Sequence, residues 1–273
     1  MTAKSETKVI PREHGATAML LTPFFAAAIL MRQIYWPEIV ALVAVACAFA
    51  VKDPLVTIAR QRFVWKQQRP ETAAAKRSAI IEIALLGICG IVLLLVRDWR
   101  PFVPLFIGAG AFTVLAVMLT VRNRQRSEWF QVASAMALSA TSLAACLAAT
   151  GDIPNWGWQL WLLCALQASS GIFVVHARLD ARIAARKQEP PPTENRRFGF
   201  ICQFILIASA FWFAFHARPW IAAALLLATL SYLGDLFRQK NPASLQMPLK
   251  QVGLQALSLS IVYTLMVIAG LWT

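Results

Sequence analysis

The stretch SAIIEIALLGICGIVLLLV, residues 78–96, decides the fold. Its one charged side chain is that of Glu82, and the residues around it are apolar or small. An α-helix of about 20 apolar residues crosses a hydrocarbon layer of roughly 30 Å. Residues 78–96 therefore predict a transmembrane helix.

The rest of the chain repeats this pattern. Hydrophobic residues make up 59% of the 273 residues and charged residues 14%, and the mean hydropathy is +0.60. A water-soluble domain of this size needs fewer apolar residues to fill its core. We expect a single all-α transmembrane domain over residues 1–273, a polytopic bundle of about nine helices. The predicted spans are residues 16–35, 37–56, 78–96, 101–121, 129–149, 156–176, 198–216, 219–237 and 251–271.

The positive charges predict the orientation of these spans. Of the 26 Lys and Arg residues, 22 lie before the first span or after an even-numbered one, and the exceptions are Arg32, Arg97, Arg100 and Arg218. Loops rich in Lys and Arg stay in the cytoplasm. We therefore place the amino terminus inside and the carboxyl terminus outside a bacterial inner (cytoplasmic) membrane. The long connections 52–77 and 177–197 then face the cytoplasm, and we expect the first helix to be retained, because no small-residue cleavage site ends it.

Two other classes of protein fit the sequence poorly. The net charge of +13 is spread between apolar runs, whereas a nucleic-acid-binding protein presents a soluble basic face, so we expect no nucleic-acid partner. The cysteines lie inside apolar stretches without metal-ligand spacing, so neither disulfides nor zinc are expected. They are Cys47, Cys89, Cys146, Cys164 and Cys202.

Ionisable side chains close to the spans are candidates for function, because such groups cost free energy near lipid. Nearly all of them fall on the predicted cytoplasmic side. The candidate catalytic residues are Glu13, His14, Glu82, His176 and Asp180, and the candidate substrate-binding residues are Arg12, Asp53, Arg60, Arg62, Arg178 and Arg182. Glu82 lies one turn inside a span and needs a partner or a wet cavity; alternatively it lies near the positive end of its helix and extends to the surface.

If the helix of residues 156–176 continues, His176 and Asp180 share one face of it. Arg178 and Arg182 then share another. A carboxylate beside an imidazole can bind a metal or move a proton, and a row of arginines suits a phosphate. The alternative is a solvated helix that is attracted to anionic lipid headgroups.

A short motif points to a family. Pro11-Arg12-Glu13-His14-Gly15-Ala16, followed by Ala18-Met19-Leu20-Leu21 and Pro23-Phe24, resembles the opening of the YwiC-like family of bacterial membrane proteins. The hydrophobic profile is compatible with this family along most of the chain. The resemblance implies a membrane protein and carries no activity with it.

The predicted architecture is also similar to that of UbiA-type intramembrane prenyltransferases. In that family, two aspartate-rich motifs after spans 2 and 6 hold magnesium against a prenyl diphosphate. Here Asp53 stands alone in the first connection, and His176 and Asp180 occupy the two ends of a DxxxD spacing in the second. The surrounding arginines would repel a divalent cation, so we predict no metal ligands and expect magnesium only if this resemblance holds.

These observations favour a protein that binds or processes a lipid-borne anionic substrate at its cytoplasmic face. A prenyl or polyprenyl phosphate would insert its tail between helices while arginines hold its phosphate or diphosphate. Membrane lipids are the expected partners. The sequence does not indicate a protein partner, and it leaves open whether the protein is an enzyme. The alternatives are a small-solute transporter and a non-catalytic membrane assembly or regulatory protein.

Overall fold

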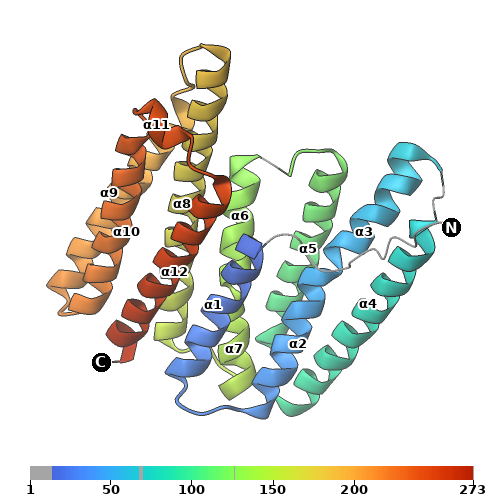
Figure 1. Cartoon of the computed structure of the whole chain (residues 1–273). Coiled ribbons are helices and arrows are strands. Elements are labelled where there is room, and N and C mark those ends of the chain that lie inside the picture. Colours follow the sequence, from blue (N-terminus) through green and yellow to red (C-terminus); the bar gives the residue numbers. More distant parts are fainter. Residues whose placement is uncertain (1–13, 68–69, 126, 273) are drawn as a thin grey trace.

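The computed structural model describes residues 14–67, 70–125 and 127–272, and the regular elements of these segments are all helical (Figure 1). Eight of the helical segments are long and apolar enough to cross a membrane, and the apolar α1 is shorter. This confirms the predicted polytopic bundle. The elements are α1 (His14–Leu30), α2 (Trp36–Ala50), α3 (Lys52–Ala59), η1 (Arg60–Trp65), α4 (Glu71–Val96), α5 (Phe102–Val121), α6 (Glu128–Ser139), α7 (Thr141–Thr150), α8 (Asn155–Lys187), α9 (Glu194–Phe215), α10 (Pro219–Arg238), α11 (Pro242–Leu245) and α12 (Leu249–Trp272).

The second span extends further than the sequence predicted. Lys52, Asp53 and Pro54 do not end the helix, because α2 continues through α3 and η1 to Trp65. Pro54 lies in the first turn of α3, where a residue without a backbone N–H is tolerated. The chain turns at Lys66, whose φ of 51° lies in the left-handed region.

Helix α8 also continues beyond its predicted end. It has 33 residues and reaches Lys187, so at 1.5 Å per residue it is about 50 Å long and exceeds the roughly 30 Å hydrocarbon layer. Gln188 ends it in the left-handed region, with φ 58°, and α9 begins at Glu194 after the proline run. The segment that carries Arg178, Asp180 and Arg182 is therefore helical.

Helix α8 is central in the packing, and it contacts α1, α6, α7, α9, α10 and α12. A second group is formed by α2, α3, α4 and α5, in which α4 packs on α2 and α3, and α5 packs on α3. Helix α2 joins this group to the rest through α7 (Figure 1). Few side chains of α4 and α5 are buried and most of them are apolar, as expected of helices that face lipid.

Three of the four arginines predicted on the outer side bind carbonyls at the carboxyl ends of helices. Arg97 donates from Nε to the carbonyl of Ala148 (3.1 Å), and Arg218 donates to that of Gly270 (2.8 Å). Arg32 donates to the carbonyl of Trp272 (3.4 Å). Carbonyls in the last turn of a helix lack intrahelical partners and carry partial negative charge. These arginines therefore have a structural reason to depart from the charge distribution of the other 22.

Candidate functional site

The structure divides the predicted site residues between the two groups of helices. Asp53, Arg60, Arg62 and Glu82 lie on α3, η1 and α4, whereas His176, Arg178, Asp180 and Arg182 all lie on α8. Arg12 and Glu13 lie outside the described residues. His14 begins α1, and its side chain is outside the described part of the chain.

His176 and Asp180 belong to one polar network, which also contains Glu128 and Gln131 of α6 and Asn195 of α9. The Nδ1 atom of His176 lies 3.6 Å from Oε1 of Glu128, and its Nε2 atom lies 3.0 Å from Oε1 of Gln131. The side-chain amide of Asn195 donates to Oδ2 of Asp180 (2.7 Å) and to Oε1 of Glu128 (3.3 Å). We call these five residues the α6–α8–α9 network.

The network brings polar groups from three spans together, and its acid–base groups lie on α6 and α8. The amide oxygen of Gln131 only accepts hydrogen bonds, so Nε2 of His176 carries a hydrogen in this contact. A second proton on Nδ1 turns the contact with Glu128 into an ion pair. Asn195 keeps the two carboxylates in place by donating to both. This arrangement can accept and release a proton at His176.

An aromatic cluster lies beside the network: Phe173 and Phe198 stand about one helical turn from His176 and Asn195, and the exposed Trp129 directly follows Glu128. Trp129 packs edge-on against Phe173 and Phe198, with ring centroids 5.9 and 5.3 Å apart. The rings of Phe173 and Phe198 are stacked, 5.4 Å apart. Each ring comes from a helix that also supplies a network residue. The network therefore borders an apolar floor on its membrane side.

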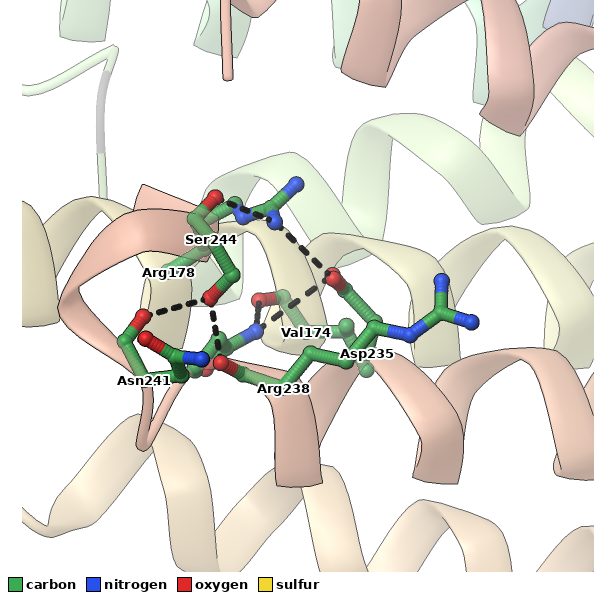
Figure 2. Close-up of polar contacts among 7 residues, drawn as sticks. Val174, Arg178, Asp235, Arg238, Asn241 and Ser244 are labelled. Atoms are coloured by element: carbon green, nitrogen blue, oxygen red, sulfur yellow. Dashed lines mark hydrogen bonds and ion pairs between the residues drawn. The ribbon is translucent and has the colours of Figure 1, made fainter. Parts of the chain in front are cut away.

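Arg178 lies on a different face of α8 and does not join the network. Its guanidinium lies 3.3 Å from Asp235 of α10 and donates to the carbonyl of Ser244 (3.1 Å). Gln239 donates to the carbonyl of Val174 (3.1 Å) beside this pair. Figure 2 shows Arg178 directed at Asp235 and Ser244. Arg178 and the predicted acid–base pair therefore share a helix but not a face.

The remaining predicted arginines differ in their surroundings. Arg60 donates to the carbonyl of Thr120 (2.9 Å) and to Oδ1 of Asn123 (3.2 Å), and so caps the carboxyl end of α5. Arg62 is exposed over the ring of Phe63, at 5.7 Å. Arg182 is partly exposed and makes no hydrogen bond or ion pair with the described residues. Of the predicted binding arginines on α8, Arg182 therefore remains for a ligand.

The two predicted carboxylates of the other group stand apart from the network. Oε1 of Glu82 accepts a hydrogen bond from Ser78 (2.8 Å), and its Oε2 is buried without a hydrogen-bond partner among the described residues. Asp53 lies 4.0 Å from the ammonium of Lys52. Helix α4 packs on α2 and α3, whereas the network lies on α6, α8 and α9. Glu82 and Asp53 therefore do not converge with His176.

This separation bears on magnesium. Within the described segments, no three His, Cys, Asp or Glu residues gather closely enough to hold a metal ion. Asp53 and Asp180 lie on helices of different groups, and Asp180 is bonded to Asn195. The described donors thus do not fit a magnesium site that bridges the two connections, and we derive no step through a metal.

Sequence reasoning missed Glu128, Gln131 and Asn195. Glu128 and Asn195 lie at the predicted cytoplasmic ends of their spans. This position is the one signal in the sequence that could have made them candidate site residues. Their partners lie far away along the chain, on another helix. A single sequence does not show which non-consecutive helices touch.

Comparison with known proteins gives one match. The family model described as YwiC-like protein matches residues 10–146, half of the chain, from the start of the Pro11–Ala16 motif into α7. No curated protein and no solved structure matches the chain significantly. The match includes Glu128 and Gln131 and ends before His176. With its apolar helices, the chain is a multi-pass integral membrane protein, and it belongs to the YwiC-like family.

Proposed function

We propose that this protein binds a lipid-borne substrate at the end of the bundle predicted to face the cytoplasm, and acts on its phosphate or diphosphate head through the α6–α8–α9 network. The observation that carries the proposal is the joining of Glu128, His176, Asp180 and Asn195 from three spans. Catalytic groups in membrane proteins are expected where ionisable side chains gather beside an apolar tail site. Here the aromatic floor supplies the apolar side.

His176 is the residue proposed to transfer a proton. Its ring is held from both nitrogens, by Gln131 and by Glu128, so its orientation is fixed before a substrate arrives. Glu128 faces the Nδ1 atom of this ring, and an imidazole that carries a proton can act as a general acid. Glu128 and Asn195 are positioning residues, because they act through His176 and Asp180.

The surrounding charge supports an anionic head. Residues 177–197 hold three acidic residues and six basic ones, and each basic residue near a membrane surface attracts anionic groups by about 1 kcal/mol. Because Arg60 and Arg178 are engaged by other helices, the proposal assigns the head to Arg182 rather than to them. Arg182 does not share the face of His176 and Asp180, so the proposal requires the head to reach around α8 from Arg182 to the network. Location in a bacterial inner membrane is part of this proposal.

Binding of farnesyl diphosphate to the full chain in nanodiscs tests the proposal, with farnesol as the uncharged control. We expect the diphosphate to bind more tightly than farnesol, because the arginine contact requires an anion. Arg182→Gln should weaken diphosphate binding by about tenfold, the loss expected for one charge-assisted hydrogen bond. Arg186→Gln, one turn further along α8, is the matched control and should change binding less than twofold. Equal binding of both probes, or equal loss in both variants, contradicts the proposal.

The catalytic part is tested separately by incubating the bound diphosphate and analysing the products by mass spectrometry. His176→Gln should keep binding and abolish turnover, because glutamine retains a donor for Gln131 but does not exchange a proton at neutral pH. Turnover that survives in His176→Gln would remove His176 from the reaction.

A further inference from the structure

Glu38 is the one acidic side chain of the described segments that is fully buried, with 3% of its surface exposed. It is the third residue of α2, at the end of the bundle predicted to face outside. Its Oε2 atom accepts a hydrogen bond from the backbone N–H of Tyr35 (2.8 Å). Its Oε1 atom is buried and has no hydrogen-bond partner among the residues that the structure describes. Half of the carboxyl group is therefore left without a donor.

The arginines of the outer end are engaged elsewhere. Arg97, which follows α4, donates to the carbonyls of Ala148 and Ala149. Arg32, in the connection between α1 and α2, donates to the carbonyl of Trp272 (3.4 Å). Ion pairs within the described part of the chain form at Asp53, Glu128 and Asp235, and none forms at Glu38. The buried carboxyl group therefore has no cation to compensate a negative charge.

The helices that pack on α2 present few titratable groups to Glu38. They are α3, α4 and α7. Helix α7 carries no charged residue, and its Cys146 is within electrostatic reach of Glu38. On α4, Cys89 and Glu82 are within electrostatic reach of Cys47, which lies nine residues further along α2, or about 14 Å at 1.5 Å per residue. The other charged residues of α3 and α4 lie beyond that depth and are Lys52, Asp53, Glu71, Lys76 and Arg77.

The neutral acid suits this position better than the carboxylate. The positive end of α2 and the N–H of Tyr35 offset part of the cost of a negative charge. The second oxygen, however, is removed both from water and from any donor, and a buried charge without a partner is costly. A proton removes that charge and needs no additional space, whereas a hydrated metal ion does not fit beside a buried oxygen.

Glu38 lies at the contact that joins the two groups of helices. The buried face of α2 continues from Glu38 to Ala41 and Ala44, and Ala41 belongs to the same buried cluster as Ala145 and Cys146 of α7. Through α7, α2 connects α3, α4 and α5 to the rest of the bundle (Figure 1). We call this contact the α2–α7 joint. A charge on Glu38 acts directly on it.

Cys146 reports whether the joint is closed. Its side chain is fully buried, and a Cβ atom at Gly157 of α8 would lie 3.1 Å from its Sγ atom. The packing around the thiol is therefore close. A thiol reagent reaches Cys146 only when a helix packed on α7 moves away.

We propose that Glu38 is a proton-binding site and that its proton holds the α2–α7 joint closed. Release of the proton leaves a buried carboxylate without a cation, and the charged group moves toward water at the nearby outer end of α2. The joint then opens, and the two groups of helices part at that end. The pH of the outer solution thus sets the fraction of open joints. The α6–α8–α9 network plays no part in this site, so this inference and the proposed function fail or succeed separately.

Modification of Cys146 by N-ethylmaleimide in nanodiscs tests the site. The parent is the full chain with Cys47, Cys89, Cys164 and Cys202 replaced by alanine. Glu38→Gln keeps an oxygen for the N–H of Tyr35 and carries no charge, so it imitates the protonated acid. The rate in the parent, divided by the rate in Glu38→Gln at the same pH, cancels the ionisation of the thiol itself. This ratio should be close to one at about pH 5 and should exceed about tenfold at about pH 9, because each pH unit shifts a titrating equilibrium by up to about tenfold.

Two controls separate opening of the joint from general loosening. Asp98→Asn changes an exposed carboxylate in an outer loop, and it should leave the rate at Cys146 equal to that of the parent at every pH. A variant that keeps only Cys164, which is buried on α8, reports on the bundle away from the joint. Glu38→Gln should change the rate at Cys164 by the same factor at every pH.

Thermal unfolding gives an independent measurement. An exposed glutamate ionises near about pH 4.3, so the unfolded chain loses this proton above that pH while the folded chain keeps it. Folding then takes up a proton, and stability falls as the pH rises. Glu38→Gln removes this dependence. It should match the parent near about pH 5 and unfold at a higher temperature than the parent near about pH 9.

Three results would overturn the inference. A ratio at Cys146 that stays constant over this pH range would show that Glu38 keeps one charge state. An equal rise at Cys164 would show unfolding of the whole bundle rather than opening of the joint. A parent that is more stable than Glu38→Gln at the higher pH would show that the carboxylate is ionised and stabilised where it lies.

Discussion

The guanidinium of Arg178 on α8 lies 3.3 Å from the carboxylate of Asp235 on α10. Arg178 is 4% exposed. Its second contact is the carbonyl of Ser244, which lies within the short helix α11. The pair therefore fixes α10 and α11 against the central helix. This contact explains how an arginine is accommodated on a buried face close to the predicted membrane boundary.

Removing Asp235 should destabilise the protein strongly. Asp235→Ala leaves the buried Arg178 charge without its carboxylate, which costs about 3 kcal/mol. Arg178→Met combined with Asp235→Ala should recover most of that loss, because no charge then remains buried. Thermal unfolding in mild detergent measures both, and Asp98→Ala at an exposed loop position is the control. Equal stability of Asp235→Ala and the Asp98→Ala control would show that the pair contributes little.

The outer arginines should matter for stability through helix ends. Arg97→Gln removes the cation that binds the last carbonyls of α7, which should cost about 1 kcal/mol. Arg100 is exposed, its backbone N–H donates to Asp98, and its guanidinium makes no hydrogen bond or ion pair with the described residues. Arg100→Gln should therefore be close to neutral. The same unfolding measurement compares the two, and equal losses would count against the capping role.

The orientation of the bundle can be read by cysteine labelling. In a variant with the five native cysteines replaced by alanine, Glu189→Cys lies beyond α8 and Asp152→Cys lies beyond α7, and both positions are exposed. An impermeant maleimide added to intact spheroplasts should label Asp152→Cys, whereas Glu189→Cys should react only after permeabilisation. The reverse labelling pattern would show that the predicted orientation is wrong and that the network lies on the outer side of the membrane.

The sequence predicted the helical fold well because each span can be recognised from its own run of apolar residues. Residues 78–96 are apolar or small except for Glu82, and they fall inside α4. Helix ends were less accurate where tertiary packing carries a helix past polar residues. Lys52, Asp53 and Pro54 look like a stop signal, yet the helix continues to Trp65, because Pro54 falls in a first turn that needs no N–H donor.

The site was predictable only in part. The i, i+4 rule correctly put His176 and Asp180 on one face of α8, and the charge pattern put them at one end of the bundle. The sequence did not reveal that Asn195 bridges Asp180 and Glu128, because that contact joins three helices, α8, α9 and α6. Nor did it reveal that Arg60 caps α5, since the carbonyl of Thr120 belongs to a helix distant along the chain.

The close approach of Gly171 to Tyr232 allows a test of how α8 packs on α10. Gly171 of α8 faces Tyr232 of α10, and a Cβ atom at position 171 would lie 2.8 Å from the tyrosine oxygen. That oxygen belongs to a rigid, buried ring and is held by Gln167 (2.7 Å). Gly171→Ala should therefore destabilise the protein by about 2 kcal/mol, as overpacking in a filled core does.

Removing the tyrosine hydroxyl should relieve this clash. Tyr232→Phe alone loses two hydrogen bonds to Gln167, one accepted from its side-chain amide (2.7 Å) and one donated to its backbone carbonyl (3.3 Å). Each is worth about 0.6 kcal/mol inside a membrane bundle. Because the oxygen nearest to position 171 is then gone, Gly171→Ala combined with Tyr232→Phe should be more stable than the sum of the single losses predicts. Gly234→Ala on α10, where nothing lies within 4 Å of a new Cβ atom, is the control and should be close to neutral. Strictly additive losses in the double variant would show that α8 and α10 do not approach each other at this point as the structure has them.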